Sequence, residues 1–304
     1  MRPVVTVVGS HPVGHEPTLK DRLLEKLRRR SAYAPAIHEA VRDQTEAGVE
    51  LVSDGQVRGD MIEIFASHIP GMTVEDGPAV IGRVEPPRFS PLVLDYREAT
   101  RVAGEVEVKA ILTGPVTLCY SLEVRTDLYP SNDHSSLLKD VARALSAEAR
   151  LLRREGASVL QVDEPILSAG VTSVKKVARY VNTVLKAFKG GTRVLHVCGD
   201  VTEVYLDLEE NIDADVFDHE FAGHPENLEV VAEGDSPIGV GVVRSDTDRV
   251  ESLDEVVGLL EKAREAMGDR IEFVDPDCGL RKLPREIAKK KLEVVRKARD
   301  RVFR

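Results

Sequence analysis

The chain of 304 residues has few cysteines and no long apolar run, and each shortage excludes a class of protein. Three cysteines are too few, and odd in number, for a disulfide framework, so we expect a reducing, cytoplasmic compartment. No stretch approaches the roughly 18 consecutive apolar residues of a membrane span, and the apolar run near the start is shorter than a signal-peptide core. We found no internal repeat and no low-complexity tract. A soluble protein is expected.

The charge balance is acidic, because 52 aspartates and glutamates face 42 lysines and arginines, which gives a net charge of −10. This sign disfavours nucleic acid and anionic membrane surfaces as general partners. Apolar residues make up 42% and charged residues 31% of the chain, enough to fill a core and to coat a surface. We expect one domain over residues 1–304, an ordinary length for a single α/β barrel.

Short β-branched runs alternate with amphipathic stretches along the chain. Eight of these runs are predicted to be strands: 4–8, 49–52, 107–112, 158–162, 193–197, 215–218, 238–242 and 271–274. Apolar residues recur with helical spacing over 138–152, ahead of Gly156. Ser252 and Glu255 form a capping box that begins another helix, and a last helix is predicted from about Pro284 onward.

This alternation predicts a parallel sheet with right-handed crossovers. Eight units favour closure into a (β/α)8 TIM barrel over an open sheet. The stretch 71–106 interrupts the pattern with several glycines and prolines between brief extended pieces such as 79–84. We expect it to be an excursion between strands two and three, either a surface loop or a flap over the barrel mouth.

Active sites of α/β barrels lie at the carboxyl ends of the strands, and metal-binding side chains follow three of the predicted strands. His196 and Cys198 follow the fifth strand, where alternation places both on the same side. Glu220 follows the sixth strand and Cys278 the eighth. Thiolates with imidazole favour Zn²⁺. His219 is the rival of Glu220, and one of the two is expected at the metal because consecutive strand residues point oppositely.

A site with two thiolates carries too much negative charge to make zinc a good generator of hydroxide. It suits the activation of a thiol, which attacks as the thiolate. Asp163, after the fourth strand, is a candidate partner for the ammonium of an amino-acid thiol, or else a carboxylate satisfied by backbone amides. Cys119 is expected to be buried as a small apolar residue.

Six short segments extend this picture over nearly the whole chain. They are Val8-Gly9-Ser10, 60–65 (DMIEIF), 112–117 (LTGPVT), 161–165 (QVDEP), 196–198 (HVC) and 275–280 (DPDCGL). Together, and in this order, they make the chain resemble the catalytic C-terminal barrel of cobalamin-independent methionine synthase. The resemblance implies zinc ligation by His196, Cys198, Glu220 and Cys278.

The resemblance further implies that homocysteine is methylated to methionine. Gly9 and Ser10 would receive the homocysteine carboxylate, Asp163 would pair with its ammonium, and Gln56 would lie in the same substrate site. Asp163 is therefore a candidate both for substrate binding and for catalysis.

Two departures from the family pattern concern the methyl donor. The family has an H-G-E motif where this chain has Asp54-Gly55-Gln56, and Asp246 stands where the family places a histidine that protonates the leaving folate. Asp246 is thus a candidate catalytic residue, with a carboxylate in place of the family's imidazole. Short single-barrel archaeal relatives imply a methylcorrinoid donor, methylcobalamin or a separate corrinoid protein, because cobalt(I) leaves without protonation.

Three alternatives stay open on the sequence. Within the family, the donor could be a folate. A related zinc methyltransferase would act on another thiol such as coenzyme M, although coenzyme M has no amine for Asp163 to pair with. The third alternative is not an enzyme: zinc with all four positions filled by protein ligands would suit a zinc-stabilised binding scaffold, since catalytic zinc normally keeps an exchangeable position.

Overall fold

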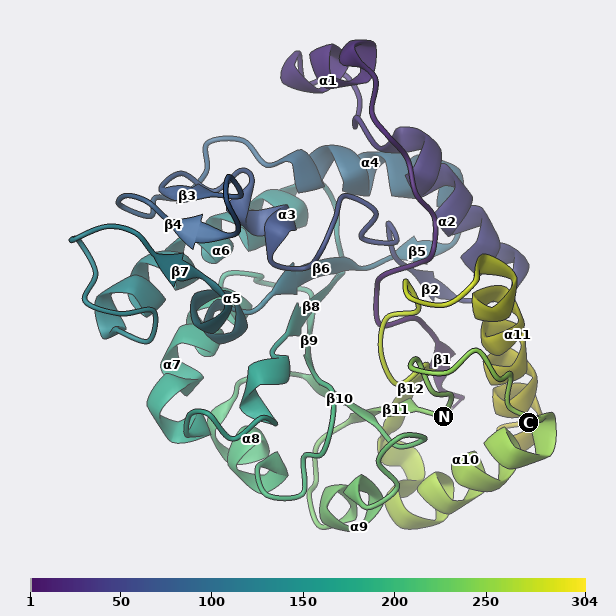
Figure 1. Ribbon diagram of the computed structural model, residues 1–304. Helices are drawn as coiled ribbons and strands as arrows, with labels where there is room; N and C mark the ends of the chain where they lie inside the picture. The colour runs from purple at the N-terminus through teal and green to yellow at the C-terminus, as the bar shows by residue number, and fades with distance from the viewer. Residues whose placement is uncertain (1) are drawn as a thin grey trace.

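The computed structural model describes residues 2–304, and Figure 1 shows helices arranged around the outside of a ring of strands. The strands are β1 (Val4–Val5), β2 (Leu51–Val52), β3 (Met72–Thr73), β4 (Ala79–Val80), β5 (Glu107–Val108), β6 (Ala110–Thr113), β7 (Glu123–Val124), β8 (Val159–Asp163), β9 (Thr192–Val197), β10 (Val216–Glu220), β11 (Ile238–Gly241) and β12 (Ile271–Asp275). The helices are α1 (Leu19–Lys26), α2 (Ala34–Glu46), α3 (Glu63–Ala66), α4 (Pro91–Ala103), α5 (Pro115–Ser121), α6 (Ser135–Arg154), α7 (Val174–Leu185), α8 (Tyr205–Asn211), α9 (Asn227–Ala232), α10 (Leu253–Met267) and α11 (Arg285–Val302), with short 3-10 turns at Pro165–Leu167 and Gly268–Arg270.

Seven strands form one parallel sheet in the order β1-β12-β11-β10-β9-β8-β6. β2 pairs with β5 in parallel, and a parallel bridge between Thr6 and Leu51 joins it to the segment that follows β1. Lys109, between β5 and β6, donates its backbone N–H to the carbonyl of Val52 at 2.9 Å. Each of the eight predicted runs contains a strand of this parallel set, and the run 107–112 is divided at Lys109. The predicted α/β barrel-type fold is confirmed.

Apart from α1, the helices bury apolar residues in the hydrophobic core. In α6, Leu138, Val141, Leu145 and Leu152 are all buried, as the helical spacing predicted. Burying a leucine side chain contributes roughly 1.5–3 kcal/mol, so this face holds α6 in place. α10 begins with the predicted capping box, in which Ser252 and Glu255 bond each other's backbone N–H. No helix within residues 2–304 is long and apolar enough to cross a membrane.

The stretch 71–106 does lie between β2 and β5, and its first part contains brief extended pieces, but the absence of a helix from the prediction was wrong. More than a third of it is the regular helix α4, whose N-cap Ser90 accepts a hydrogen bond from the N–H of Leu92. Pro91 occupies the first helical position, where a proline starts a helix because its missing N–H needs no partner. The remainder supplies β3 and β4, which join β7 in a three-stranded sheet.

α1 belongs to the long connection between β1 and α2. Figure 1 shows it standing off the rest of the molecule, and none of its eight residues is buried. Thr18 and Asp21 form a capping box that begins the helix locally. Since the connection leaves the carboxyl end of β1, α1 belongs to the same end of the barrel as the active sites of this fold class.

Candidate functional site

Three metal-binding side chains converge at the carboxyl ends of the strands. His196 lies on β9, Cys198 follows that strand directly, and Cys278 lies in the loop after β12. Their ligand atoms all lie within 4.8 Å of one another, with the imidazole buried and the two thiols half-buried. The sheet thus brings together three of the four residues predicted to bind the metal.

Asp218 fixes the orientation of the imidazole. It lies beside His196 in the register of β9 and β10, and its Oδ2 is 2.9 Å from His196 Nδ1. A carboxylate only accepts, so Nδ1 carries a hydrogen, and Nε2 is the nitrogen that offers a lone pair once its own proton is displaced. Nε2 is buried without a hydrogen-bond partner among the described residues. A buried polar atom of this kind needs a partner, and an imidazole lone pair beside two thiols fits a thiophilic cation such as Zn²⁺.

The charges of the site are strongly coupled. Burial opposes the protonation of His196, but the Asp218 carboxylate and the two cysteine side chains together outweigh burial and raise the pKa of the imidazole well above its ordinary value. The hydrogen bond from Cys198 lowers the pKa of the Cys278 thiol to about 4, and the same bond raises the pKa of Cys198. The metal-free cluster therefore holds one thiolate and retains protons that a bound cation would displace.

Glu220 and His219 end β10 and point in different directions. His219 Nδ1 donates to the carbonyl of Val197 at 2.9 Å, and its ring packs edge-on against Tyr205, at 5.5 Å between centroids. The imidazole is thus turned toward α8. Glu220 is not within the 4.8 Å group, and its Oε2 lies 3.8 Å from Nε2 of His224. Burial and the negative charge of Cys278 raise the pKa of the Glu220 carboxyl.

A cavity of about 320 Å³ opens beside the cluster. Its walls come from the segments that follow β1, β2, β8, β9, β11 and β12. The lining residues are Val8, Ser10, Gln56, Gly59, Asp60, Met61, Asp163, Pro165, His196, Cys198, Ser245, Asp246, Cys278, Gly279, Arg281 and Lys282. The pocket therefore collects Ser10, Gln56, Asp163 and Asp246 around the thiols. No residue of 71–106 belongs to this lining, so the flap over the barrel mouth gains no support.

Gly9 shapes this pocket from behind. A Cβ at this position would lie 2.6 Å from Oε1 of Gln56 and 2.9 Å from Cδ1 of Ile111, so any larger residue would displace the Gln56 side chain. Gln56 itself has a φ of 45°, and Arg281 donates to its carbonyl and to that of Gly59. These contacts tie the loop after β2 to the loop that carries Cys278.

The two acidic residues of the Q-V-D-E-P segment have separate roles. Asp163 lines the pocket, accepts from Gln161 Nε2 at 2.7 Å, and has its pKa raised to about 6 by burial. Glu164 is buried and accepts the N–H groups of Val116 and Thr117 at 2.9 and 2.7 Å. Glu164 thus holds the N-terminus of α5 and is turned away from the pocket lining.

Asp246 lines the cavity mouth but is largely exposed. It forms an ion pair with Arg244 at 2.6 Å, and that hydrogen bond lowers the pKa of the carboxyl. At neutral pH the group is therefore a carboxylate and carries no proton to donate.

Sequence reasoning missed the polar residues that support the site. Lys109 is buried inside the barrel, where its Nζ donates to Oε1 of Gln161 at 2.5 Å. Asp277 is buried and accepts three backbone N–H groups from Phe221 to Gly223, which fixes the turn after Glu220. Asp277 is adjacent to Cys278 in the D-P-D-C-G segment, and that position was the available signal. Cys119 is fully buried, as predicted.

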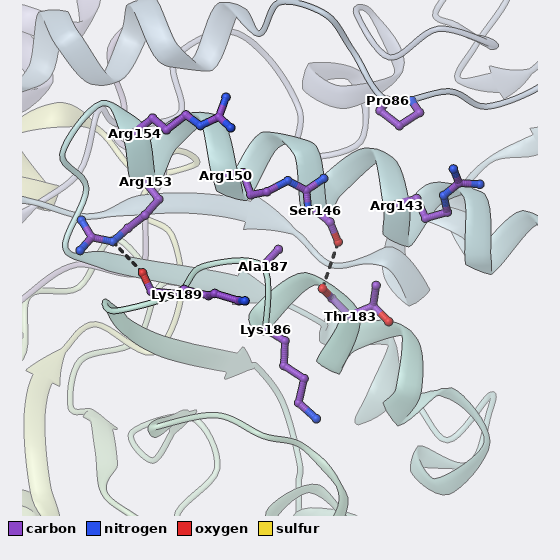
Figure 2. A pocket seen from close by; sticks show the side chains of 10 residues that line it. All are labelled: Pro86, Arg143, Ser146, Arg150, Arg153, Arg154, Thr183, Lys186, Ala187 and Lys189. Atoms are coloured by element: carbon purple, nitrogen blue, oxygen red, sulfur yellow. Dashed lines mark hydrogen bonds between the residues drawn. The ribbon is translucent and has the colours of Figure 1, made fainter.

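A larger cleft of about 810 Å³ lies on the outside of the barrel, between α6 and α7. Figure 2 shows its cationic side chains, with Arg153 bonded to the carbonyl of Lys189 and Ser146 to that of Thr183. It contains none of the thiol, imidazole or carboxylate groups described above, so we place the chemistry in the smaller pocket.

A barrel-type α/β fold with an imidazole and two thiols gathered at its strand ends is typical of an enzyme, and this group of side chains could hold a thiophilic metal. Residues 4–300 match the family model described as the catalytic domain of cobalamin-independent synthase. The chain belongs to the cobalamin-independent methionine synthase family and is a methyltransferase.

Archaeal relatives match the chain over nearly its whole length. It is 41% identical over 302 residues to the methionine synthase of Methanothermobacter thermautotrophicus, covering 95% of this chain and 97% of the relative. It is 35% identical over 304 residues to that of Methanocaldococcus jannaschii, covering 95% and 96%. A solved structure of a B12-independent methionine synthase from Shewanella sp. W3-18-1, in complex with selenomethionine, superposes with a TM-score of 0.81 at 22% identity, covering 99% and 98%. That likeness concerns the fold.

Proposed function

We propose that this methyltransferase transfers a methyl group to the thiol of homocysteine and releases methionine. Zn²⁺ would be held by His196, Cys198, Cys278 and Glu220, and the methyl donor would be a methylcorrinoid. Such a donor is a substrate and not a group that the chain retains. The observation that carries the proposal is the His196–Cys198–Cys278 cluster opening into a pocket lined by Asp163 and Ser10.

The pocket suits an amino-acid thiol. Asp163 lies on the strand next to His196, directly opposite it in register, so its carboxylate can pair with an ammonium while the thiol faces the cluster. Ser10 lines the same cavity and offers a hydroxyl and backbone groups for the substrate carboxylate. A thiol without an amine, such as coenzyme M, would leave the buried Asp163 carboxylate with the neutral Gln161 amide but without a cationic partner, which is costly.

Zinc bound at the cluster would lower the pKa of the substrate thiol so that it is ionised at neutral pH. The residues of the chain orient the reactants. Asp163 and Ser10 hold the amino-acid end of homocysteine, and the pocket walls direct its sulfur at the methyl carbon. The sulfur–carbon bond forms as the bond to the donor breaks, and the electron pair leaves with the donor.

The state of Asp246 supports a corrinoid donor. A folate leaving group needs a proton, whereas cobalt(I) does not. Asp246 is held as a carboxylate by Arg244, and His196 is the only imidazole among the residues that line the pocket. The donor side of the pocket therefore offers no imidazole acid, in keeping with a leaving group that needs none.

Glu220 is the ligand that we expect to yield when the substrate thiol arrives. A carboxylate oxygen is a weaker donor to zinc than a thiolate or an imidazole in this set. Its side chain is half-buried, and its Oε2 already lies 3.8 Å from His224 Nε2, outside the group formed by His196 and the two thiols. Exchange of this oxygen for the substrate sulfur would keep four ligands on the metal.

A methyl-transfer assay on the zinc-loaded protein tests the proposal. With homocysteine as acceptor, we expect methionine to form faster from methylcobalamin than from methyltetrahydrofolate, and we expect coenzyme M to be a poor acceptor. Equal or faster transfer from methyltetrahydrofolate would overturn the proposal that the donor is a methylcorrinoid. Faster methyl transfer to coenzyme M than to homocysteine would overturn the proposal that homocysteine is the acceptor.

A further inference from the structure

α1 exposes an unusual amount of apolar surface for its size. Leu19, Leu23 and the C-cap residue Leu27 follow one another at a spacing of four, so they lie on one face of the helix. Their side chains are 88%, 56% and 55% exposed. Among the described residues, eight large apolar side chains are exposed, and three of them fall within this segment of nine residues. Contiguous apolar surface of this kind marks interaction sites.

The charges around the leucines all have the same sign. Lys20 lies on one side of the apolar face, Arg22 and Lys26 lie on the other, and all three are exposed. None of the three forms an ion pair within residues 2–304. The outward face of α1 is therefore apolar with a cationic border, although the chain as a whole carries a net charge of −10.

Both acidic residues of α1 are used within the molecule. Asp21 accepts from the backbone N–H and the hydroxyl of Thr18, at 2.9 and 2.6 Å. Glu25 Oε1 accepts from the N–H of Ala32 at 2.9 Å and from Arg58 Nη2 at 2.5 Å. Neither carboxylate compensates the cations on the outward face, so that face has a local positive charge.

The same Glu25 contact links α1 to the wall of the reaction pocket. Arg58 is also held by Asp95, at 2.8 Å from Nη2 to Oδ1, and it directly precedes Gly59, which lines the cavity. α1 is thus fastened to the loop after β2, which forms one wall of the pocket. A protein that bound the outward face of α1 would be held close to the pocket mouth.

We propose that the outward face of α1 docks the protein that presents the methyl group, through an apolar groove with an acidic rim on that protein. The inference rests on the proposed corrinoid donor in its protein-bound form. Opposite charge around an apolar contact speeds association and sets orientation. The leucines supply the short-range contact, in the manner of an amphipathic helix entering a groove.

The size and charge of the surface favour this occupant over a second copy of the chain. Eight helical residues span about 12 Å, which is too little for the roughly 1,200 Å² or more that a stable interface buries. Two copies joined through this face would also oppose their cations. A small, charged contact suits a donor that binds and leaves in every catalytic cycle.

The test compares two donors with the same enzyme. The probes are free methylcobalamin and the methylated corrinoid protein purified, by its corrinoid absorbance, from the cells that produce this chain. The variants are the double substitutions Leu19→Ser with Leu23→Ser, and Lys20→Glu with Lys26→Glu. The matched controls are Leu206→Ser and Lys262→Glu, which alter exposed side chains on other helices.

Both double variants should retain the wild-type kcat/KM with free methylcobalamin and lose at least about tenfold with the corrinoid protein. The controls should lose nothing with either donor, and the wild-type rate with the corrinoid protein should fall as salt is raised. Unchanged kcat/KM with the corrinoid protein, or equal losses with both donors, would overturn the docking role. So would a wild-type dimer in solution that the variants dissociate, which would assign the face to a second copy.

Failure of the underlying function has a different signature. If the wild-type enzyme accepted no methyl group from either corrinoid donor, the proposed donor would be wrong and the docking role would fall with it. If the wild type used both donors and the α1 variants used them equally well, the proposed donor would stand and only the docking role of α1 would be wrong.

Discussion

His196 Nδ1 lies 2.9 Å from Oδ2 of Asp218, the residue beside it on the neighbouring strand. This contact fixes both the tautomer and the rotation of the imidazole, so that Nε2 faces the two thiols. Both side chains are almost fully buried, and water competes little for the bond. The pair has the form of the carboxylate–histidine arrangement that tunes metal sites in proteins.

Asp218→Asn should weaken zinc binding by about 10–100-fold, because an amide holds the imidazole less firmly and makes it a poorer donor. Competition with a chelator of known affinity measures the effect. Asp248→Asn, the same change at an exposed position, is the control. Zinc affinity equal to that of the wild type in the folded Asp218→Asn protein would contradict the role of this contact.

Replacing either clustered cysteine should remove the metal and the activity together. For Cys198→Ser and Cys278→Ser we expect a stoichiometry well below one zinc per chain and loss of methyl transfer, because a serine hydroxyl is a poor ligand for zinc at neutral pH. Cys119→Ala is the matched control, since Cys119 is buried away from the cluster. Full zinc content and activity in either serine variant would rule out the site.

Glu220→Gln should keep zinc, in contrast to the cysteine variants. The amide oxygen can still approach the metal, and three stronger donors remain in place. Zinc content by atomic absorption, after dialysis against a weak chelator, gives the comparison. The expectation fails if Glu220→Gln loses zinc as readily as Cys278→Ser does.

Asp163→Asn should impair the recognition of the substrate amine. 4-Mercaptobutanoate is homocysteine without its amino group, so it is the matched acceptor. We expect the wild type to prefer homocysteine by about 10–100-fold, the value of a charged hydrogen bond, and the variant to lose that preference mainly through KM. An unchanged preference in Asp163→Asn would show that another group binds the ammonium.

Glu164 should make stability depend on pH. Burial raises its pKa from 4.5 to about 7, so between these values the folded protein holds a proton that the unfolded chain releases. The stability that Glu164 contributes should therefore be complete below pH 4.5, fall as the pH rises toward 7, and level off above it, by at most about 3 kcal/mol. The free energy of unfolding in urea, compared with that of Glu164→Gln, isolates this effect. A difference independent of pH would contradict it.

The sequence predicted the strands and the thiol cluster because both depend on local patterns. β-branched runs mark the strands, and the rule that barrel sites lie at strand ends groups His196, Cys198 and Cys278. Asp163 was predicted from its position at a strand end and from the family resemblance, Ser10 from the resemblance, and both line the pocket.

Contacts that depend on the register between strands could not be predicted from the sequence. Asp218 and Lys109 resemble ordinary polar strand residues until the sheet places them inside the barrel. α4 was missed because the prolines of 71–106 were taken as interruptions, whereas one of them, Pro91, begins a helix. The sheet of β3, β4 and β7 unites segments from two different connections, a pairing that no local pattern encodes.

X-ray absorption at the zinc edge tests the central claim most directly. In the zinc-loaded protein we expect two sulfur ligands, from Cys198 and Cys278, together with nitrogen and oxygen donors. Addition of homocysteine should raise the sulfur count to three and remove one oxygen. A zinc shell that stays the same at saturating homocysteine would contradict thiol activation at this site and favour a structural metal.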